Sequence, residues 1–376
     1  EFLLNHKFTK TLGSTYNLQI DSNLDKFKEN KWGIIQNMDP GRIDGITEKF
    51  TNTYKPDFMK WLNPEITFNP TYTWDLNLLS ETNTADVKSY SKFGTKLGLN
   101  IPYFIELFYT PDKGKSSRRG RGSRNSSSNK NNKKINIQNP TARWILGKLY
   151  SLTSKIKTIT PNYTYSTTHK YNNIQADLNP SYLYRFGLHE SPFYKSGLVY
   201  GESTDSENIV ISDEHIYVED LRVNTTINIV NSVTTSLEYK TSNTLNESST
   251  TSNSKNTSET YFPIGTRGDQ GFPITNWNIN WTKIEKFWLF EKLFKSVSLS
   301  HGFNGEKSTT FSNSALQNEQ YSMHFSPIIG FNSTTKGLNP ITINAHYNLG
   351  QNIKNTNETT ERDHTSQISA SIKYKK

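Results

Sequence analysis

The residue types that most often carry catalysis or bind metals are scattered in this sequence. It has no cysteine, which excludes disulfides, thiolate metal ligands and cysteine nucleophiles. No two of its eight histidines stand three to five residues apart, so neither a helical metal pair nor an HExxH motif exists. The histidines are His6, His169, His189, His215, His301, His324, His346 and His364.

The densest group of acids and imidazole is Asp213-Glu214-His215, followed by Glu219 and Asp220. Carboxylates with one histidine could hold a cation, but the favoured interpretation is an acidic, solvent-exposed loop. No GxGxxG, GxxxxGK or GxSxG motif occurs. The sequence therefore predicts no enzyme, no catalytic residue, no metal site and no cofactor. A triad assembled in space from distant segments is left open.

Composition narrows the fold class that could position any such residues. Only 32% of the 376 residues are hydrophobic, below the roughly 45–50% of ordinary globular domains. Disordered chains and barrels with one polar face both tolerate so low a share. Disordered segments are poor in aromatics, whereas this chain has 20 Tyr, 20 Phe and 7 Trp. A folded chain is therefore expected.

The length of the apolar runs and the first residues of the sequence indicate whether a transmembrane helix or a signal peptide is present. No run approaches 18 consecutive apolar residues, so no transmembrane helix is expected. The chain opens on Glu1-Phe2-Leu3-Leu4 without a signal peptide. We therefore expect a mature segment, or a fragment whose export signal lies outside this sequence.

Period-2 alternation is the dominant pattern, and it places residues i, i+2 and i+4 on one face of a strand. In residues 66–76 one face carries Ile66, Phe68, Tyr72, Trp74 and Leu76. The other face carries Thr67, Asn69, Thr71, Thr73 and Asp75. Similar alternation occurs in residues 12–20, 93–103, 159–168, 182–188, 223–229, 233–239, 297–303, 321–325, 341–349 and 368–374.

These segments have the length of about 9–11 residues that a tilted strand needs to cross a bilayer. The pattern predicts an all-β fold, an antiparallel transmembrane β-barrel with roughly 12–14 strands here, long polar loops and one or two short helices. The alternative is a water-soluble β-sandwich or barrel, whose strands are usually shorter.

Aromatic residues recur near the segment ends, where the girdles of a membrane barrel would lie. The expected lipid-facing or girdle aromatics are Tyr72, Trp74, Tyr103, Tyr182, Tyr184, Tyr347 and Tyr374. Residues 240–260 and 351–366 are almost entirely polar and are predicted to be extracellular loops. Asn231-Ser232 is predicted to be a short periplasmic turn between two strands.

Three segments lack the strand period. Residues 22–32 are charged and show no β pattern. Residues 142–157 carry apolar side chains at helical spacing, which predicts an amphipathic helix. Residues 283–295 alternate apolar and charged groups and could form another helix. The last two would lie in the lumen or at the membrane interface; a helical turn packed on a loop is the alternative.

A basic, low-complexity segment lies at residues 112–136 and is predicted to be a flexible loop inserted between strands. Its nine Lys and Arg residues between 113 and 134 equal the net charge of +9. A solvated loop is favoured over contact with anionic lipid head groups. Nucleic acid is the least favoured partner, since these residues include no aromatic side chain for base stacking.

Residues 272–303 carry the most specific motif of the chain. They include a Phe-Pro-Ile-Thr-Asn-Trp run, Trp281, and then Phe-Lys-Ser-Val-Ser-Leu-Ser-His. This resembles the carboxyl-terminal region of the gliding-motility SprA (Sov) family, the outer-membrane translocon of the type IX secretion system. The matching residues are Pro273, Asn276, Trp277, Trp281, Phe294, Lys295, Val297, Leu299 and His301. Whatever the function, Pro273 and Trp277 are expected to shape a turn and an interface anchor.

The resemblance implies that residues 1–376 are the carboxyl-terminal part of a much longer chain that forms one very large barrel. It implies an outer-membrane channel that exports folded cargo proteins. The implied partners are cargo with a type IX sorting domain, a barrel shuttle protein, a periplasmic plug and outer-membrane lipid. Two other functions remain as alternatives: a stand-alone porin or solute transporter, and a soluble or surface β-rich adhesin.

Overall fold

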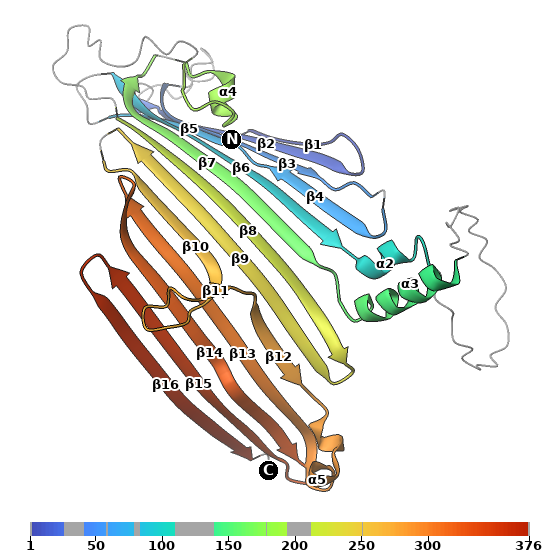
Figure 1. The fold of residues 1–376 in the computed structure, drawn as a ribbon. Coiled ribbons are helices and arrows are strands. Elements are labelled where there is room, and N and C mark those ends of the chain that lie inside the picture. The colour runs from blue at the N-terminus through green and yellow to red at the C-terminus, as the bar shows by residue number, and fades with distance from the viewer. Residues whose placement is uncertain are drawn as a thin grey trace, which may run out of the picture.

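A computed structural model describes residues 2–25, 41–57, 59–78, 83–109, 139–177, 179–193, 212–249 and 251–374. Its strands form one sheet of sixteen strands, and every strand pairing in it is antiparallel (Figure 1). The prediction of an all-β antiparallel fold is therefore confirmed. None of the helices in these residues is long and apolar enough to cross a membrane.

The amino-terminal half of the sheet follows the chain order. It contains β1 (Phe2–Lys7), β2 (Leu12–Asn23), β3 (Arg42–Tyr54), β4 (Leu62–Phe68), β5 (Thr71–Leu76), β6 (Thr84–Leu99) and β7 (Thr160–Gln175). The short strands β4 and β5 share one position, because both pair with β3 on one side and β6 on the other. Pro70 interrupts them, since proline cannot donate to the ladder.

The carboxyl-terminal half continues the same meander. It contains β8 (Ser212–Val230), β9 (Val233–Ser248), β10 (Ser254–Phe262), β11 (Phe272–Pro273), β12 (Asn276–Trp281), β13 (Phe294–Ser312), β14 (Ala315–Thr335), β15 (Ile341–Thr356) and β16 (Thr360–Tyr374). Here β10 and β12 share one position between β9 and β13. The predicted turn at Asn231-Ser232 is confirmed and joins β8 directly to β9.

Several segments predicted as loops are strands. Most of residues 240–260 belong to β9 and β10, and most of residues 351–366 belong to β15 and β16. The acidic group at 213–220 lies within β8. These predictions were wrong because ladder bonds are made by the backbone, which pairs Ser, Thr, Asn and Glu as well as apolar residues.

Other segments are helical. The predicted strand at 182–188 is instead the short helix α4 (Tyr182–Arg185), and Tyr103 lies in α2 (Ile101–Ile105). The predicted helix at 142–157 is confirmed as α3 (Pro140–Thr153), which the side chain of Asn139 caps. Residues 283–295 form two short turns, η2 (Ile284–Lys286) and α5 (Trp288–Glu291), rather than one helix.

Two of the predicted segments lie partly or wholly outside the residues that the structure describes. In the charged segment 22–32, residues 22 and 23 continue strand β2, while residues 26–32 lie outside the described residues. The basic segment 112–136 also lies outside the described residues.

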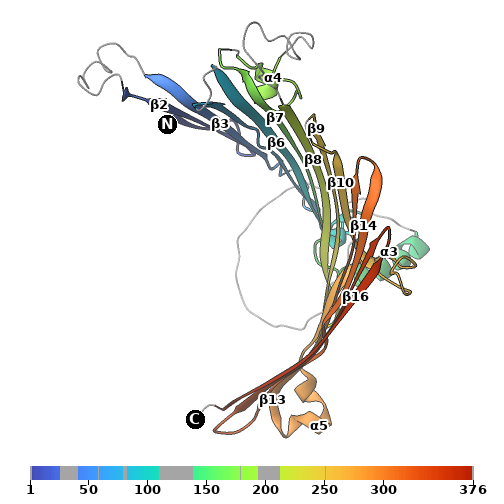
Figure 2. The ribbon, with the colours of Figure 1, turned by 90° about the vertical axis from the view of Figure 1, so that its left-hand side faces the viewer.

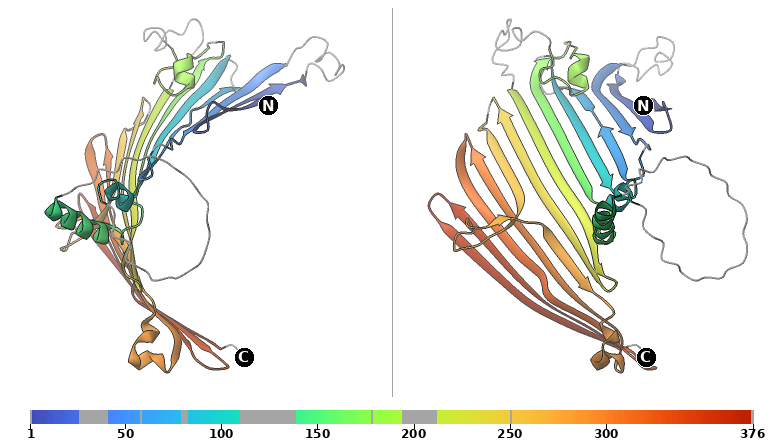
Figure 3. Two further views of the ribbon diagram at one scale, coloured as in Figure 1. Left: turned by 90° about the vertical axis from the view of Figure 1, so that its right-hand side faces the viewer. Right: turned by 45° about the vertical axis from the view of Figure 1, so that its right-hand side comes forward.

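The sheet curves across its strands into an open arc, with β1 at one edge and β16 at the other (Figure 2). Helix α4, the 263–271 connection, α3 and α5 lie on the convex side, and the concave side carries none of these elements (Figures 2 and 3). Among the residues that the structure describes, most of the sheet is therefore a single layer without a second layer on either face.

The buried apolar clusters of the described residues are small and lie under connecting segments. The first joins Tyr72, Val87, Tyr171, Ile174 and Tyr184, where α4 covers the convex face. The second joins Tyr261, Tyr321 and Ile353. There the 263–271 connection crosses the sheet, and Asn355 Nδ2 donates to the Arg267 carbonyl at 2.7 Å. A soluble sheet normally buries one whole face against another layer, and no such layer occurs in the part of the chain that the structure describes.

Candidate functional site

The strand register sorts side chains onto two faces across the whole sheet. One row of directly paired residues reads Leu237, Trp277, Phe303, Phe325 and Leu349, from β9 to β15. A neighbouring row on the other face reads Thr234, Asn280, Ser300, Gly330, His346 and Ser369. Because side chains alternate along each strand, one face is apolar and the other is polar.

The apolar row lies on the convex face, since it shares that face with Tyr321 of the covered cluster. We call the apolar half of this face the apolar band. It comprises Leu221, Val223, Leu237, Trp277, Ile279, Trp281, Leu299, Phe303, Phe325, Ile329, Phe331, Ile341, Ile343, Ala345, Tyr347, Leu349, Ile368 and Ile372. Ile329 is 60% exposed and Ile368 is 80% exposed. Soluble monomers rarely expose large continuous apolar patches.

Three of the motif residues that the resemblance singled out, Trp277, Trp281 and Leu299, lie in this band. Pairing of β12 with β13 sets Trp277 opposite Phe303 and Trp281 opposite Leu299. The Trp277 and Phe303 rings stack at 4.3 Å between centroids. His301 lies opposite Ile279. Of the other motif residues, Pro273 lies in β11, Asn276 begins β12, and Phe294, Lys295 and Val297 begin β13.

The other half of the convex face, toward α4, is charged. Glu259 lies opposite Lys307, and Lys307 Nζ is 3.6 Å from Glu319 Oε1. Lys307 also lies over the rings of Tyr261 and Tyr321, at 5.7 and 5.5 Å from their centroids. The convex face thus changes from apolar to charged part-way along the strands.

Helix α4 is anchored on this charged half. Tyr184 is completely buried, and its hydroxyl donates to the His169 carbonyl at 2.7 Å. Arg185 Nε donates to Glu48 Oε2 at 2.7 Å, and a second bond joins its guanidinium to the same carboxylate. Burial alone would lower the pKa of Arg185, but the hydrogen bond and negative charge of Glu48 raise it above its ordinary value.

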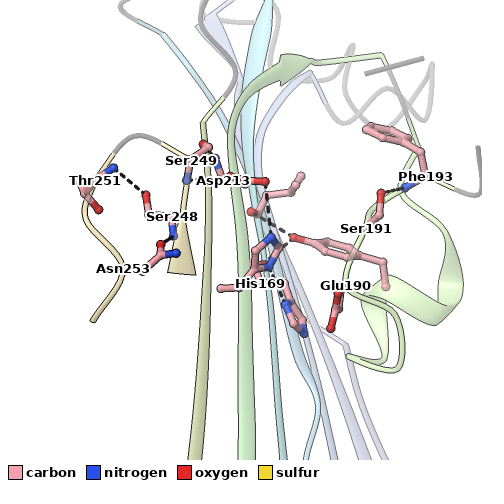
Figure 4. A network of polar contacts seen from close by, with 12 residues as sticks. His169, Glu190, Ser191, Phe193, Asp213, Ser248, Ser249, Thr251 and Asn253 are labelled. Atoms are coloured by element: carbon pink, nitrogen blue, oxygen red, sulfur yellow. Dashed lines mark hydrogen bonds and ion pairs between the residues drawn. The ribbon is translucent and has the colours of Figure 1, made fainter. Parts of the chain in front are cut away.

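His169, which Figure 4 labels, forms a pair with His215 beside this anchor. His169 Nδ1 and His215 Nδ1 share a hydrogen bond of 2.9 Å, and His215 Nε2 is 3.5 Å from Asp213 Oδ2. The described residues contain no group of three His, Asp or Glu arranged to hold a metal ion. The hydrogen bond between the two imidazoles links β7 to β8.

The predicted girdle aromatics occupy different environments. Tyr72 and Tyr184 are buried under α4, so the prediction that they face lipid was wrong. Trp74 packs against the same cluster. Tyr347 lies half-buried in the apolar band, whereas Tyr103, Tyr182 and Tyr374 are exposed. Sequence alternation could not identify the burial of Tyr184, since the contact depends on a segment that folds back over the sheet.

Exposed aromatic helices lie at the apolar end of the strands, which is also the end with the Asn231-Ser232 turn (Figure 1). In α5, Trp288 is 82% exposed. In α3, Trp144, Ile145, Leu149 and Leu152 are all exposed, and Lys148 Nζ lies 6.0 Å from the Trp144 ring centroid. Aromatic and aliphatic groups beside lysines are typical of helices that lie in a membrane interface.

Comparison with protein-family models and with curated proteins finds no match to this chain.

Proposed function

We propose that this chain is a wall segment of an outer-membrane channel that exports folded proteins. The observation that carries the proposal is the pair of opposed faces: an uncovered apolar band on the convex side and a polar concave side. In a membrane barrel the outward face contacts lipid and the inward face contacts water. In such a wall, the apolar face of a one-layer sheet contacts lipid and its polar face contacts water.

The dimensions of the band support this placement. On β15 the band covers residues 341–349, nine residues that span roughly 30 Å at about 3.3 Å each. With a tilt of about 45°, the band would be roughly 21 Å tall, near the ~25 Å apolar height of membrane barrels. Strands β13 and β14 have 19 and 21 residues, so their charged halves would extend beyond the bilayer.

The curvature favours a wide passage over a solute porin. Thirteen successive strand positions, from β1 to β16, still form an open arc (Figure 2). Barrels of 16–18 strands already leave an aqueous channel, and an arc this open would close with more strands than that. A wide lumen suits the passage of folded proteins better than that of small solutes.

Further features follow from the resemblance to the SprA (Sov) family. The proposed partners are secreted cargo, a shuttle barrel protein and a periplasmic plug. No catalytic step is part of the proposal. Small polar side chains such as Ser300 and Asn280 would line the passage without holding a moving chain tightly.

Single-cysteine labelling tests the two faces, because the chain has no native cysteine. Leu299 and Ser300 are neighbours on β13 and face opposite sides. A fluorophore on Leu299→Cys should be quenched by lipid-attached nitroxide, and one on Ser300→Cys by aqueous iodide. Iodide quenching alone at both positions would refute membrane contact.

In exporting cells, cargo should cross-link to Ser300→Cys and not to Leu299→Cys; a solute porin would give neither product.

A further inference from the structure

A hollow of about 820 Å³ lies in the concave face, where several strand irregularities coincide. Strand β10 pairs with β9 as far as Thr241, and β12 resumes the pairing at Glu238. Beside this break, β13 and β14 shift register between Ser300 and Phe303. Irregularities of this kind are frequent next to binding sites.

Side chains, rather than backbone pairs, close the break. Asn276 Nδ2 donates to Asn304 Oδ1 at 2.6 Å, and the Gly305 amide donates to Asn276 Oδ1 at 2.9 Å. At Gly302 a β-carbon would lie 2.7 Å from the Ser326 carbonyl oxygen, so β13 and β14 approach closely here. The contacts of Asn276, Asn304 and Gly302 therefore fix the shape of the hollow. Its volume lies within the roughly 300–1,000 Å³ of ordinary ligand sites.

The lining carries excess positive charge. Lys157, Arg222 and Lys240 line the hollow together with a single acid, Glu238. Arg222 Nε lies 2.7 Å from Glu238 Oε1, which neutralises one cation. Among the described residues, no carboxylate lies within salt-bridge distance of Lys157 or Lys240. Lys157 and Lys240 are thus two exposed cations of the lining that no described carboxylate neutralises.

The neutral lining is rich in hydrogen-bonding groups. It includes the side chains of Asn224, Thr226, Ser236, Asn276, Asn278 and Asn304. Amides and hydroxyls can donate to a carboxylate and can also bond to a peptide backbone. Cations together with such donors match an acidic, extended polypeptide better than they match a neutral solute.

We propose that this hollow binds acidic segments of the polypeptide that the channel conducts, through Lys157, Arg222 and Lys240. This inference rests on the proposed function for the identity of its ligand. The contact would be weak and reversible, because the cations are exposed and screened by salt. Such a site would retain a passing acidic segment briefly at the channel wall.

Cross-linking within the hollow tests the proposal without interference from basic residues elsewhere. Asn278 is exposed and lines the hollow, so the intact protein would carry Asn278→Cys. A glutamate-rich peptide with one activated cysteine is compared with its glutamine counterpart. A carboxylate about 6 Å from a cation in water gains roughly threefold in binding, so two unpaired cations predict about tenfold faster cross-linking of the glutamate peptide.

Removing cations from the hollow should lower the ratio of the two cross-linking rates, and removing its acid should raise that ratio. Arg222→Gln with Lys240→Gln should bring the rate ratio close to one, and Glu238→Gln should raise it about threefold. Lys88→Gln is the matched control, because Lys88 is an exposed cation of β6 outside the hollow. An equal fall in the ratio with Lys88→Gln, or a ratio near one in the parent protein, would overturn the proposal. The proposal would also be overturned if inorganic phosphate slowed the cross-linking of the glutamate peptide as strongly as a second glutamate peptide does.

Circular dichroism and lipid quenching at Leu299→Cys establish that each variant retains its sheet. Correct quenching without glutamate selectivity would reject the hollow as a site and leave the channel proposal standing. Glutamate selectivity in a protein that exports no cargo would reject the channel proposal and leave the anion site standing.

Discussion

Replacing Ile329 with arginine separates a membrane wall from a soluble sheet. Ile329 lies in β14, opposite Tyr347 in the apolar band, and is 60% exposed. Asn332 lies three residues further along the same strand, is also exposed, and faces the concave side. The same substitution at both positions therefore compares the two faces within one strand.

The expected magnitudes differ strongly between the two environments. In water, an exposed surface substitution usually changes stability by less than about 0.5 kcal/mol. In a membrane barrel, arginine on the lipid face costs about 2–4 kcal/mol near the bilayer midplane. That cost corresponds to a roughly 30- to 700-fold smaller equilibrium constant for folding. Asn332→Arg, in the aqueous passage, should remain within about 0.5 kcal/mol of the parent.

Folding of the intact protein into lipid vesicles, followed by urea titration, measures this difference. A second measurement is the fraction of each variant that assembles in the outer membrane of cells. Ile329→Arg should assemble poorly and Asn332→Arg normally. Equal stability of the two variants in vesicles would show that the convex band does not contact lipid, and the reasoning from the two faces would fail.

Three further predictions concern the elements around the band. Tyr184→Ala should weaken the docking of α4 by about 3–5 kcal/mol, and Tyr184→Phe by about 1 kcal/mol, both measured by hydrogen exchange at Tyr182–Arg185; unchanged exchange in Tyr184→Ala would contradict the packing. Gly305→Ala should disturb the β10–β12 junction, because the added carbon would lie 2.1 Å from the Tyr261 carbonyl oxygen, and a loss of thermal stability should report it. Trp288→Ser should reduce quenching of a nearby label by lipid nitroxide while leaving the sheet content unchanged in circular dichroism, since Trp288 is exposed; an unfolded sheet would instead indicate a packing role.

The strands whose two faces differ in polarity were predictable. Alternation in residues 66–76, 297–303 and 341–349 identifies strands, and the structure places them in β4, β5, β13 and β15. Helix α3 was predictable as well, because its apolar spacing and the Asn139-Pro140 start agree. In both cases a local pattern coincides with the final environment.

Strands with polar residues on both faces were not predictable from alternation. Residues 254–260 of β10 are Ser, Lys, Asn, Thr and Glu, yet each pairs with β13. Their strand structure depends on ladder bonds to neighbours such as β9, which hold whatever the side chains are. The hollow was missed because its cations meet through tertiary contacts: Arg222 and Lys240 face each other across the β8–β9 hairpin, and the backbone of Lys157, in the connection before β7, donates to the Thr226 carbonyl of β8.

The sequence by itself determined which residues share a face, because a side-chain period of two is a property of the extended backbone. Tertiary structure decided how far along each face the apolar character extends and which segments cover it. Glu48 and Arg185 form one ion pair although 137 positions separate them, and that contact brings α4 over Tyr72. Such contacts arise from the order and register of the strands, and alternation within a single strand carries no information about its neighbours.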